Sequence, residues 1–479
     1  MSAYIVYGGE KIPLRRLIKR LPTPVFMSAL HVEVCRRLVD GMVDGMAEEA
    51  GVDSQLQPLL TNLVFNKSSD AKGLTALITL IRSGDLPPVA LYADFIDSRF
   101  DDLLGDAVER HRNSPRSALV DLRYLLRFVI KVLLHRVFRL IAGRLAPADT
   151  VICAYTDISE RLYPEDAPTA GWLIYPYAPS IFRGLAYQRR GRREGRNFAL
   201  AGMPYRFSDI LRVLCFFRQR DTVLAQIERR VFNEHADELL ALQAKKLCTC
   251  DEYEAAAYIL HDKLLAAGIE THNACHGIAT YGPYVSAGHF VFFNAAQHAF
   301  YSLHGRFSSH RIVAPAAALD APPSEAGELC VVYVQGNWIA SSKPYEYRFD
   351  QHLRAALAAA CRELDVDCYI RAHPNLSQRR RQQIESENGL KMMGDWSGLY
   401  GRPVVFVNFL SSAFYDFRQR GPTLFVGDSV LDPQLLFGSG CGVVSLESLQ
   451  PSLAQFKNGL YRQKVQREQL EFVTGSPAL

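Results

Sequence analysis

The sequence lacks the long apolar segments that mark membrane-spanning and exported chains. No stretch of about 18 residues is both apolar and free of charge, so we expect no transmembrane helix. The first apolar run, Ala3–Tyr7, is short and leads into basic residues instead of a longer apolar core, so we expect no signal peptide. These two absences predict a cytoplasmic protein.

Paired metal ligands and several common catalytic motifs are also missing. Cys248 and Cys250 lie close together, but no second cysteine pair follows at the spacing of a zinc site. Asp365 and Asp367 imitate a metal-binding carboxylate pair, yet they stand where a strand is expected to begin. The chain has no P-loop, no HExxH and no GxSxG sequence. We therefore expect a site without metal or bound cofactor.

Length and composition indicate a globular protein of more than one domain. The chain has 479 residues, enough for two or three domains. Its 48% hydrophobic and 22% charged residues match a folded chain rather than a disordered one. A net charge of only +4 gives no general attraction to nucleic acid.

Short apolar runs alternate with amphipathic stretches, a pattern that predicts parallel sheets covered by helices. The clearest boundary is Ala314–Gly327, which is rich in Ala and Pro and has no periodic pattern. We expect an N-terminal domain over 1–313, a C-terminal domain over 328–445, and a helical tail over 446–479 that packs back on the first domain. The expected strands are Tyr4–Tyr7, Pro88–Ala93, Thr150–Tyr155, Gly171–Tyr175, Glu270–Cys275, Leu329–Val334, Asp367–Arg371, Val404–Asn408, Thr423–Val426 and Gly442–Ser445.

A basic stripe marks the expected helix over 116–144. Arg123, Arg127, Lys131 and His135 recur every four residues on an otherwise apolar helix. Two interpretations stay open. The segment is either a core helix whose charged stripe faces water, or a helix that lies in a membrane interface or against a lipid-linked acceptor.

A second basic segment, Arg183–Arg196, reads as a loop dense in arginine. It is either a solvated loop or a site for anionic acceptor groups or lipid headgroups, because the guanidinium fork matches phosphate and carboxylate. The candidate acceptor or membrane contacts are Arg183, Arg189, Arg190, Arg192 and Arg193.

Polar residues follow the first strand of the C-terminal domain, at the edge where parallel sheets bind ligands. Gly336 permits a close approach of the backbone, and Gln335 and Asn337 offer side-chain donors. A tight turn explains these three residues equally well.

The next strand ends in Arg371, Ala372, His373 and Pro374. An arginine and a histidine at a strand end suit a phosphate, and Pro374 fixes the backbone after the histidine. His373 is expected to stabilise the charge that grows on a departing nucleotide phosphate. The alternative is a strand-end histidine that meets solvent.

The strand Val404–Asn408 is followed by Ser411 and Ser412, at the point where a helix is expected to begin. Their hydroxyl groups and the backbone N–H groups of the helix start form a potential anion site. Helix capping by serine uses the same geometry, so the two interpretations are compatible. Asp416, about one turn later, is a candidate ribose contact.

These motifs carry a resemblance to a known group of enzymes. "RAHP", an apolar strand with "SSAFYD", and "RGPTLFVGD" resemble the HP and serine-pair motifs of bacterial surface-polysaccharide glycosyltransferases. That group includes sialyltransferases, capsule Kdo transferases and polyglycerol-phosphate transferases, and the resemblance covers roughly residues 270–445. It implies a GT-B fold, which is α/β with two Rossmann-like domains facing a cleft. It also implies that His373, Ser411 and Ser412 hold the nucleotide phosphate. Asp416 stands where the group often has Glu.

The N-terminal domain is expected to bind the acceptor and to supply a catalytic base. His276 begins a His-Gly sequence that resembles the motif of surface-polymer transferases, and it is the first candidate. Asp157 and Asp94 follow other expected strands, where helix capping is an alternative role. Inversion needs one base, whereas retention needs a nucleophilic carboxylate such as Asp157.

The resemblance therefore predicts transfer of an acidic sugar, of the Kdo or sialic type, from a CMP-activated donor. The acceptor would be a surface polysaccharide or a lipid-linked oligosaccharide, with the protein attached peripherally to the inner membrane. Two alternatives stay open. One is an enzyme that transfers polyol phosphate from a CDP donor, and the other is a non-catalytic, membrane-associated scaffold that retains the fold. The basic loop alone gives little support to binding of nucleic acid.

Overall fold

The structure is a computed structural model, and it describes most of the chain after residue 117. Before that point it describes residues 4–7, 10–13, 56, 58–59, 62 and 91–92. From 118 to 474 it leaves out residues 155–158, 177–180, 217–219, 252–253, 276, 278–283, 303–304, 316, 318–326, 337–343, 374–375, 377, 389, 395–398, 400, 428–432 and 439–441.

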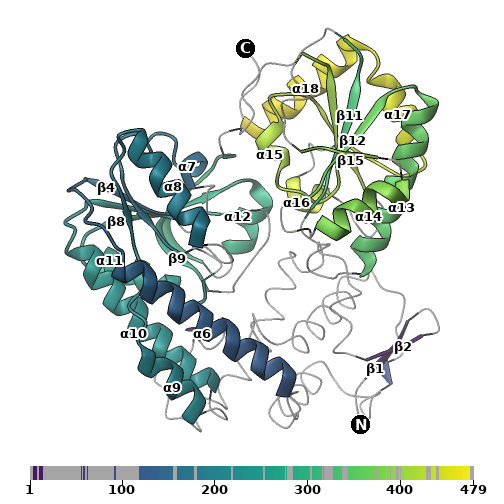
Figure 1. Cartoon of the computed structure of the whole chain (residues 1–479). Helices are drawn as coiled ribbons and strands as arrows, with labels where there is room; N and C mark the ends of the chain where they lie inside the picture. Colours follow the sequence, from purple (N-terminus) through teal and green to yellow (C-terminus); the bar gives the residue numbers. More distant parts are fainter. Residues whose placement is uncertain are drawn as a thin grey trace.

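The first domain is built on a seven-stranded parallel sheet (Figure 1). Its strand order is β10-β9-β8-β7-β4-β5-β6, so the chain starts in the middle, winds to one edge, returns and winds to the other. This reversal is the doubly wound order of nucleotide-binding domains, with its switch point between β4 and β7. The strands are β4 (Thr150–Ala154), β5 (Gly171–Ile174), β6 (Phe198–Leu200), β7 (Lys246–Thr249), β8 (Glu270–Ala274), β9 (Ser286–Phe292) and β10 (Arg306–Ile312). The helices are α6 (Ala118–Leu140), α7 (Ser159–Leu162), α8 (Ile181–Arg193), α9 (Phe207–Cys215), α10 (Arg220–Leu240), α11 (Ala257–Ala266) and α12 (Ala295–Tyr301).

The second domain repeats this plan with a six-stranded parallel sheet in the order β13-β12-β11-β14-β15-β16. Its switch point lies between β11 and β14, two strands whose side chains are buried throughout. The strands are β11 (Cys330–Val334), β12 (Asp367–Arg371), β13 (Lys391–Met392), β14 (Val404–Asn408), β15 (Thr423–Val426) and β16 (Val443–Val444). The helices are α13 (Pro344–Glu363), α14 (Gln378–Asn388), α15 (Phe414–Phe417), α16 (Gln434–Phe437), α17 (Leu449–Gln455) and α18 (Gly459–Thr474).

Two doubly wound parallel sheets in one chain confirm the expected fold class, α/β with two Rossmann-like domains. The expected linker Ala314–Gly327 lies between the last strand of one sheet and the first strand of the other. A third, antiparallel sheet joins β1 (Tyr4–Tyr7), β2 (Glu10–Pro13) and β3 (Leu91–Tyr92) in the order β2-β1-β3. The first expected strand therefore belongs to this small sheet and not to a parallel one.

The two domains meet through Tyr415, which is buried although it belongs to the short helix α15. Its hydroxyl accepts a hydrogen bond from Asn294 Nδ2 at 3.0 Å, and its ring stands edge-on to Phe293 with centroids 5.4 Å apart. In Figure 1, α12 of the first domain and α16 of the second lie in the region between the two sheets, and these helices are in contact. The apolar core is consequently continuous from one sheet to the other.

The tail packs on the second domain, so the expectation that it returns to the first is wrong. Gln469 of α18 accepts a hydrogen bond from Thr423 N–H at 2.9 Å and donates one to the Thr423 carbonyl at 2.6 Å. Gln466 donates to the Arg418 and Gln419 carbonyls, just before β15. These amide side chains satisfy backbone groups where β15 begins, and they fix the helix there.

The basic stripe on α6 faces water only in part: Arg127 is exposed, whereas Lys131 and His135 have partners within the first domain. Lys131 Nζ lies 3.3 Å from Glu228 Oε1, and the buried His135 ring accepts a hydrogen bond from Met203 N–H at 3.0 Å. Burial lowers the pKa of His135, and Lys131 adds to this effect. Lys131 and His135 therefore face α10 and the loop before α9, and the side-chain packing of Arg123 lies outside the described residues. Among the described helices, none has the length and apolarity to cross a bilayer.

The arginine-dense segment is a helix, α8, where a loop was expected. Leu185, Gln188 and Gly191 are spaced by three residues and face inward. A Cβ built on Gly191 would lie 2.6 Å from the Phe198 ring, so only glycine lets α8 approach β6 this closely. The high arginine content suggested a solvated loop, although arginine is itself a good helix former.

Candidate nucleotide site

Three neighbouring strands of the second sheet end at the same edge and carry the predicted nucleotide-binding residues. Val334, the last residue of β11, is paired with Arg371 of β12 on one side and with Asn408 of β14 on the other. Two strand spacings separate Arg371 from Asn408, which is about 10 Å. His373 follows Arg371 by two residues, and Ser411 follows Asn408 by three. The fold therefore brings these two predicted residues to one edge, beside the switch point.

The turn that carries the serines is held by Asn408. Ser411 N–H donates to Asn408 Oδ1 at 2.8 Å, and Asn408 Nδ2 donates to the Ser411 carbonyl at 2.9 Å. Ser411 Oγ accepts a hydrogen bond from Ala413 N–H at 3.4 Å, whereas Ser412 is half-buried. The turn leads into α15, a helix of only four residues, so the contribution expected from a helix dipole is small.

His373 stands half-buried directly after β12. Burial lowers the pKa of its imidazole below the usual value, and the neighbouring Arg381 guanidinium lowers it further. The Arg381 side chain also donates to the Leu376 and His373 carbonyls, at 3.2 and 3.5 Å. A neutral histidine beside an arginine suits an anionic ligand, whose charge would offset that of Arg381 and favour protonation of His373.

Two predicted side chains have other partners. Gln335 is buried, and its Nε2 donates to Asp350 Oδ1 of α13 at 3.2 Å. Arg371 donates from Nη1 to the Gly394 carbonyl at 2.6 Å, just after the edge strand β13. Gln335 therefore joins the end of β11 to α13, and Arg371 joins the end of β12 to the segment after β13. Gly336 remains at the end of β11, next to the switch point.

Asp416, the predicted ribose contact, forms an ion pair with Arg161 of α7 in the first domain. Both side chains are about three-quarters buried, and the Arg418 guanidinium is close enough for its pKa to respond to Asp416 and Arg161. Burial is the main cause of the lowered pKa of Arg418. Sequence analysis missed Arg161 and Arg418, although both lie within four residues of residues that it selected.

The predicted catalytic bases fall outside the described residues, as do two nucleotide-binding candidates: Asp94, Asp157, His276, Asn337 and Pro374. In the sequence, Asp157 comes three residues after the end of β4 and His276 comes two residues after the end of β8. Of the acceptor candidates, Arg189, Arg192 and Arg193 are exposed on α8. The side chains of Arg183 and Arg190 lie outside the described residues.

One carboxylate at the switch point of the first sheet is described, and sequence analysis overlooked it. Asp251 follows β7, is fully buried, and lies 3.1 Å from His261 Nε2 and 2.9 Å from Thr249 Oγ1. The Cys248-Thr-Cys250 sequence, which resembles half of a metal motif, ends β7, and both thiols are buried. Because Asp251 has no exposed surface, it organises the strand end rather than contacting an acceptor.

No known protein family matches this chain, and no curated protein sequence does. Solved structures with a similar general backbone arrangement include the following three. A Listeria monocytogenes protein described as a UDP-N-acetylglucosamine 2-epimerase aligns over 67% of this chain and 91% of its own, with 10% identity and a TM-score of 0.43. MurG of Acinetobacter baumannii aligns over 69% and 96%, with 9% identity and a TM-score of 0.36. A glycosyltransferase from Rickettsia africae aligns over 70% and 95%, with 9% identity and a TM-score of 0.41. Likenesses this distant carry no functional argument, so the fold assignment rests on the order and direction of the strands.

Proposed function

We propose that this protein is a GT-B glycosyltransferase that moves a sugar from a nucleotide donor to a glycan acceptor without a metal ion. The main support is that His373 and the Ser411 turn follow the two strands that flank β11, at the switch point of a doubly wound sheet, where such sheets bind nucleotides. A second doubly wound sheet in the same chain offers a separate domain for the acceptor.

The proposed chemistry assigns the leaving nucleotide to the second domain. The Ser412 N–H group and the hydroxyls of Ser411 and Ser412 would bind the donor phosphate, and His373 would donate a hydrogen bond to it. Negative charge grows on that phosphate as the sugar departs, so donors fixed in advance stabilise the transition state more than the ground state. The Asn408 hydrogen bonds provide this fixation for the turn.

The acceptor would bind to the first domain, with His276, Asp157 or Asp94 as the base that removes the proton of the attacking hydroxyl. Asp157 has additional support, because it follows the strand at the switch point of its sheet. The donor we propose is a CMP-linked acidic sugar of the Kdo or sialic type, which rests on the resemblance of "RAHP" and "SSAFYD". The acceptor would be a surface polysaccharide or a lipid-linked oligosaccharide, and the enzyme would work in the cytoplasm.

A thermal-shift panel with CMP, CDP, UDP and GDP tests the proposal, because a ligand that binds only the folded state raises its melting temperature. We expect CMP to stabilise the wild type and His373→Ala to lose most of that shift. Stabilisation by CDP alone would favour transfer of polyol phosphate instead. Absence of any shift, together with no release of CMP from CMP-sugars, would leave a non-catalytic scaffold as the better interpretation.

A further inference from the structure

Exposed apolar side chains gather on two helices of the first domain. Of the fourteen large apolar side chains exposed among the described residues, ten lie on α6 and α9 or directly after them. A single exposed leucine is ordinary, but a contiguous apolar patch marks an interaction site. The ten residues are Leu126, Ile130, Leu133, Val137, Leu140, Ile141, Phe207, Leu211, Leu214 and Phe216.

On α6 the exposed residues form one stripe along the helix. Leu126, Ile130, Leu133, Val137 and Leu140 follow one another in steps of four and three residues, so they share a face. Leu126 at one end is 57% exposed and Leu140 at the other is 79% exposed. A stripe of this kind normally faces the core of a soluble protein, and here the opposite face of the helix is the buried one.

The shorter helix α9 repeats this arrangement. Phe207, Leu211 and Leu214 are spaced by four and three residues and are exposed, with Leu211 at 62%. Asp209 and Val213 lie between them in sequence and are buried. The helix α9 therefore also exposes an apolar face, and its opposite face packs against the domain through Asp209 and Val213.

The two stripes belong to one surface, which we call the α6–α9 surface. The helices are in contact, and the Arg136 guanidinium of α6 lies over the Phe207 ring of α9, 5.2 Å from its centroid. Figure 1 shows α6, α9 and α10 together below the first sheet. The apolar side chains of both helices are thus available to a single partner.

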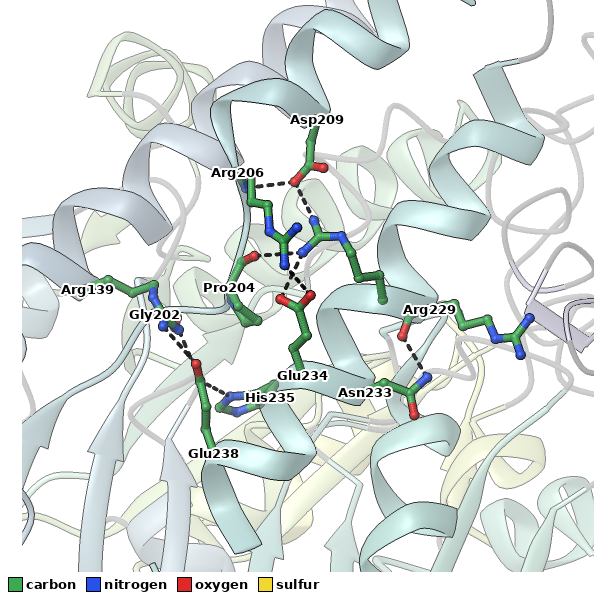
Figure 2. Close-up of polar contacts among 11 residues, drawn as sticks. Arg139, Gly202, Pro204, Arg206, Asp209, Arg229, Asn233, Glu234, His235 and Glu238 are labelled. Atoms are coloured by element: carbon green, nitrogen blue, oxygen red, sulfur yellow. Dashed lines mark hydrogen bonds and ion pairs between the residues drawn. The ribbon is translucent and has the colours of Figure 1, made fainter. Parts of the chain in front are cut away.

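Three described acidic groups beside this surface, Asp209, Glu234 and Glu238, are paired with arginines. Asp209 accepts hydrogen bonds from Arg206 N–H and Arg230 Nη2, both at 2.7 Å, and Glu234 accepts one from Arg230 Nη1 at 2.9 Å (Figure 2). Glu238 is paired with Arg139 at 2.7 Å. These ion pairs neutralise the three carboxylates, which therefore add no net negative charge to the α6–α9 surface.

Several arginines around the surface have no such partner. Arg127, Arg144 and Arg212 are exposed, and among the described residues no carboxylate pairs with them; Arg212 donates to Gln226 Oε1 at 2.7 Å. A Cβ built on Gly143 would lie 3.2 Å from Arg192 Nη2, so Arg192 of α8 reaches the segment directly after α6. The exposed apolar face is therefore bordered by unneutralised cations.

We propose that the α6–α9 surface docks on the anionic face of a lipid bilayer. Its apolar side chains would enter the boundary between headgroups and acyl chains, and the bordering arginines would contact lipid phosphates. A second copy of the chain is a poorer occupant, because a symmetric dimer would bring the same arginines face to face. The proposal concerns binding alone and does not depend on the proposed transfer reaction.

The test is flotation of the full chain with vesicles of phosphatidylcholine, with and without phosphatidylglycerol. We expect strong binding only with phosphatidylglycerol, and weaker binding when NaCl is raised from about 0.1 to about 0.5 M, because salt screens the arginines. The triple variant Leu126→Gln, Leu133→Gln, Leu211→Gln should bind at least about tenfold more weakly. Leu460→Gln is the matched control, because Leu460 is 78% exposed on α18, far along the chain.

A melting curve for each variant shows whether the fold is retained. We expect every variant to fold, because the substituted side chains are exposed. The variant Arg127→Gln, Arg144→Gln, Arg212→Gln gives a second measurement and should lose the preference for phosphatidylglycerol. Equal vesicle binding by wild type and the leucine variant would overturn the proposal. The proposal would also be overturned if the wild type did not bind vesicles but formed a dimer in sedimentation, and if the leucine variant alone abolished that dimer.

Discussion

Asn408 fixes Ser411 by two hydrogen bonds that run in opposite directions. The side-chain amide accepts from Ser411 N–H at 2.8 Å and donates to the Ser411 carbonyl at 2.9 Å. Asn408 is fully buried as the last residue of β14, so the strand itself holds the amide in place. The conformation of the predicted phosphate-binding turn is therefore set by a residue inside the sheet.

Asn408→Ala should weaken nucleotide binding even though Asn408 is not itself a predicted ligand. Both hydrogen bonds disappear and leave buried polar groups unpaired, which destabilises the fold by about 1–3 kcal/mol. The released turn must then be ordered by the ligand, so we expect CMP affinity to fall about tenfold. Calorimetric titration with CMP and thermal unfolding measure the two effects.

Gln469→Ala is the matched control for Asn408→Ala. Gln469 makes the same pair of amide hydrogen bonds, to the N–H and carbonyl of Thr423, but at the start of β15 and not at its carboxyl end. It should lower stability to a similar extent and leave CMP affinity unchanged. If both variants lose affinity equally, Asn408 acts only through stability.

Nucleotide binding should take up a proton at His373. Burial and Arg381 lower the pKa of the free imidazole, and an adjacent phosphate would raise it again. We therefore expect CMP affinity to increase as the pH falls from about 8 towards the usual pKa of histidine at about 6.5. Titration in buffers of different ionisation enthalpy measures the uptake directly, and His373→Gln should abolish it. The same uptake in the variant would place the proton elsewhere.

The lowered pKa of His373 also affects stability. As the pH falls, the unfolded chain binds this proton before the folded chain does, so stability decreases once the pH passes below the unfolded value. His373→Gln should make the decrease shallower between about pH 6.5 and about pH 5. Unfolding midpoints of both proteins across this range check the sign.

The Arg161–Asp416 ion pair links the two domains through a residue predicted to contact the donor. If Asp416 binds the ribose, Arg161 competes with the nucleotide. Arg161→Gln should then raise CMP affinity, and Asp416→Asn should lower it. Neither variant should change stability by more than about 1 kcal/mol, because the pair is partly exposed and screened. Equal effects of both substitutions on affinity would show that Asp416 acts only as a domain contact.

The strands at the second site were predictable because their side chains are buried throughout. "CVVYV" and "VVFVN" are continuous runs of the apolar, largely β-branched type that fills the centre of a parallel sheet, and both strands lie within a residue of their expected bounds. The edge strand β10, "RFSSHRI", carries mostly exposed and polar side chains, so it gave no apolar signal and was missed. The two-residue strand β13 is too short to show a pattern.

Side-chain partners were far less predictable than strand positions. His373 and Ser411 lie at the expected edge because a motif directly after a strand must lie there in a parallel sheet. The contact of Gln335 with Asp350 joins the end of a strand to the helix that follows it, 15 residues along the chain, and that of Asp416 with Arg161 joins residues 255 apart in two domains. No local pattern records such a contact. Their roles in nucleotide binding stay predictions.

Asp350 and Arg354 form a fully buried ion pair under the switch point. Arg354 Nε lies 2.8 Å from Asp350 Oδ2, and Tyr333 donates its hydroxyl hydrogen to Oδ1 at 2.7 Å. Burial raises the pKa of Asp350, and the Arg354 guanidinium opposes that rise. Asp350→Ala leaves the arginine charge buried and unpaired, so we expect a loss of about 3–5 kcal/mol in the free energy of unfolding.

The double variant Asp350→Leu, Arg354→Leu removes both charges and fills much of the space with apolar groups. Replacing a whole buried ion pair in this way is often neutral, so its urea midpoint should lie close to that of the wild type and well above that of Asp350→Ala. Because Gln335 loses its hydrogen bond to Asp350 in both variants, the comparison separates the unpaired charge from the lost contact. Equal destabilisation of the single and double variants would show that the hydrogen bonds to Asp350, and not its pairing with Arg354, stabilise this part of the second domain.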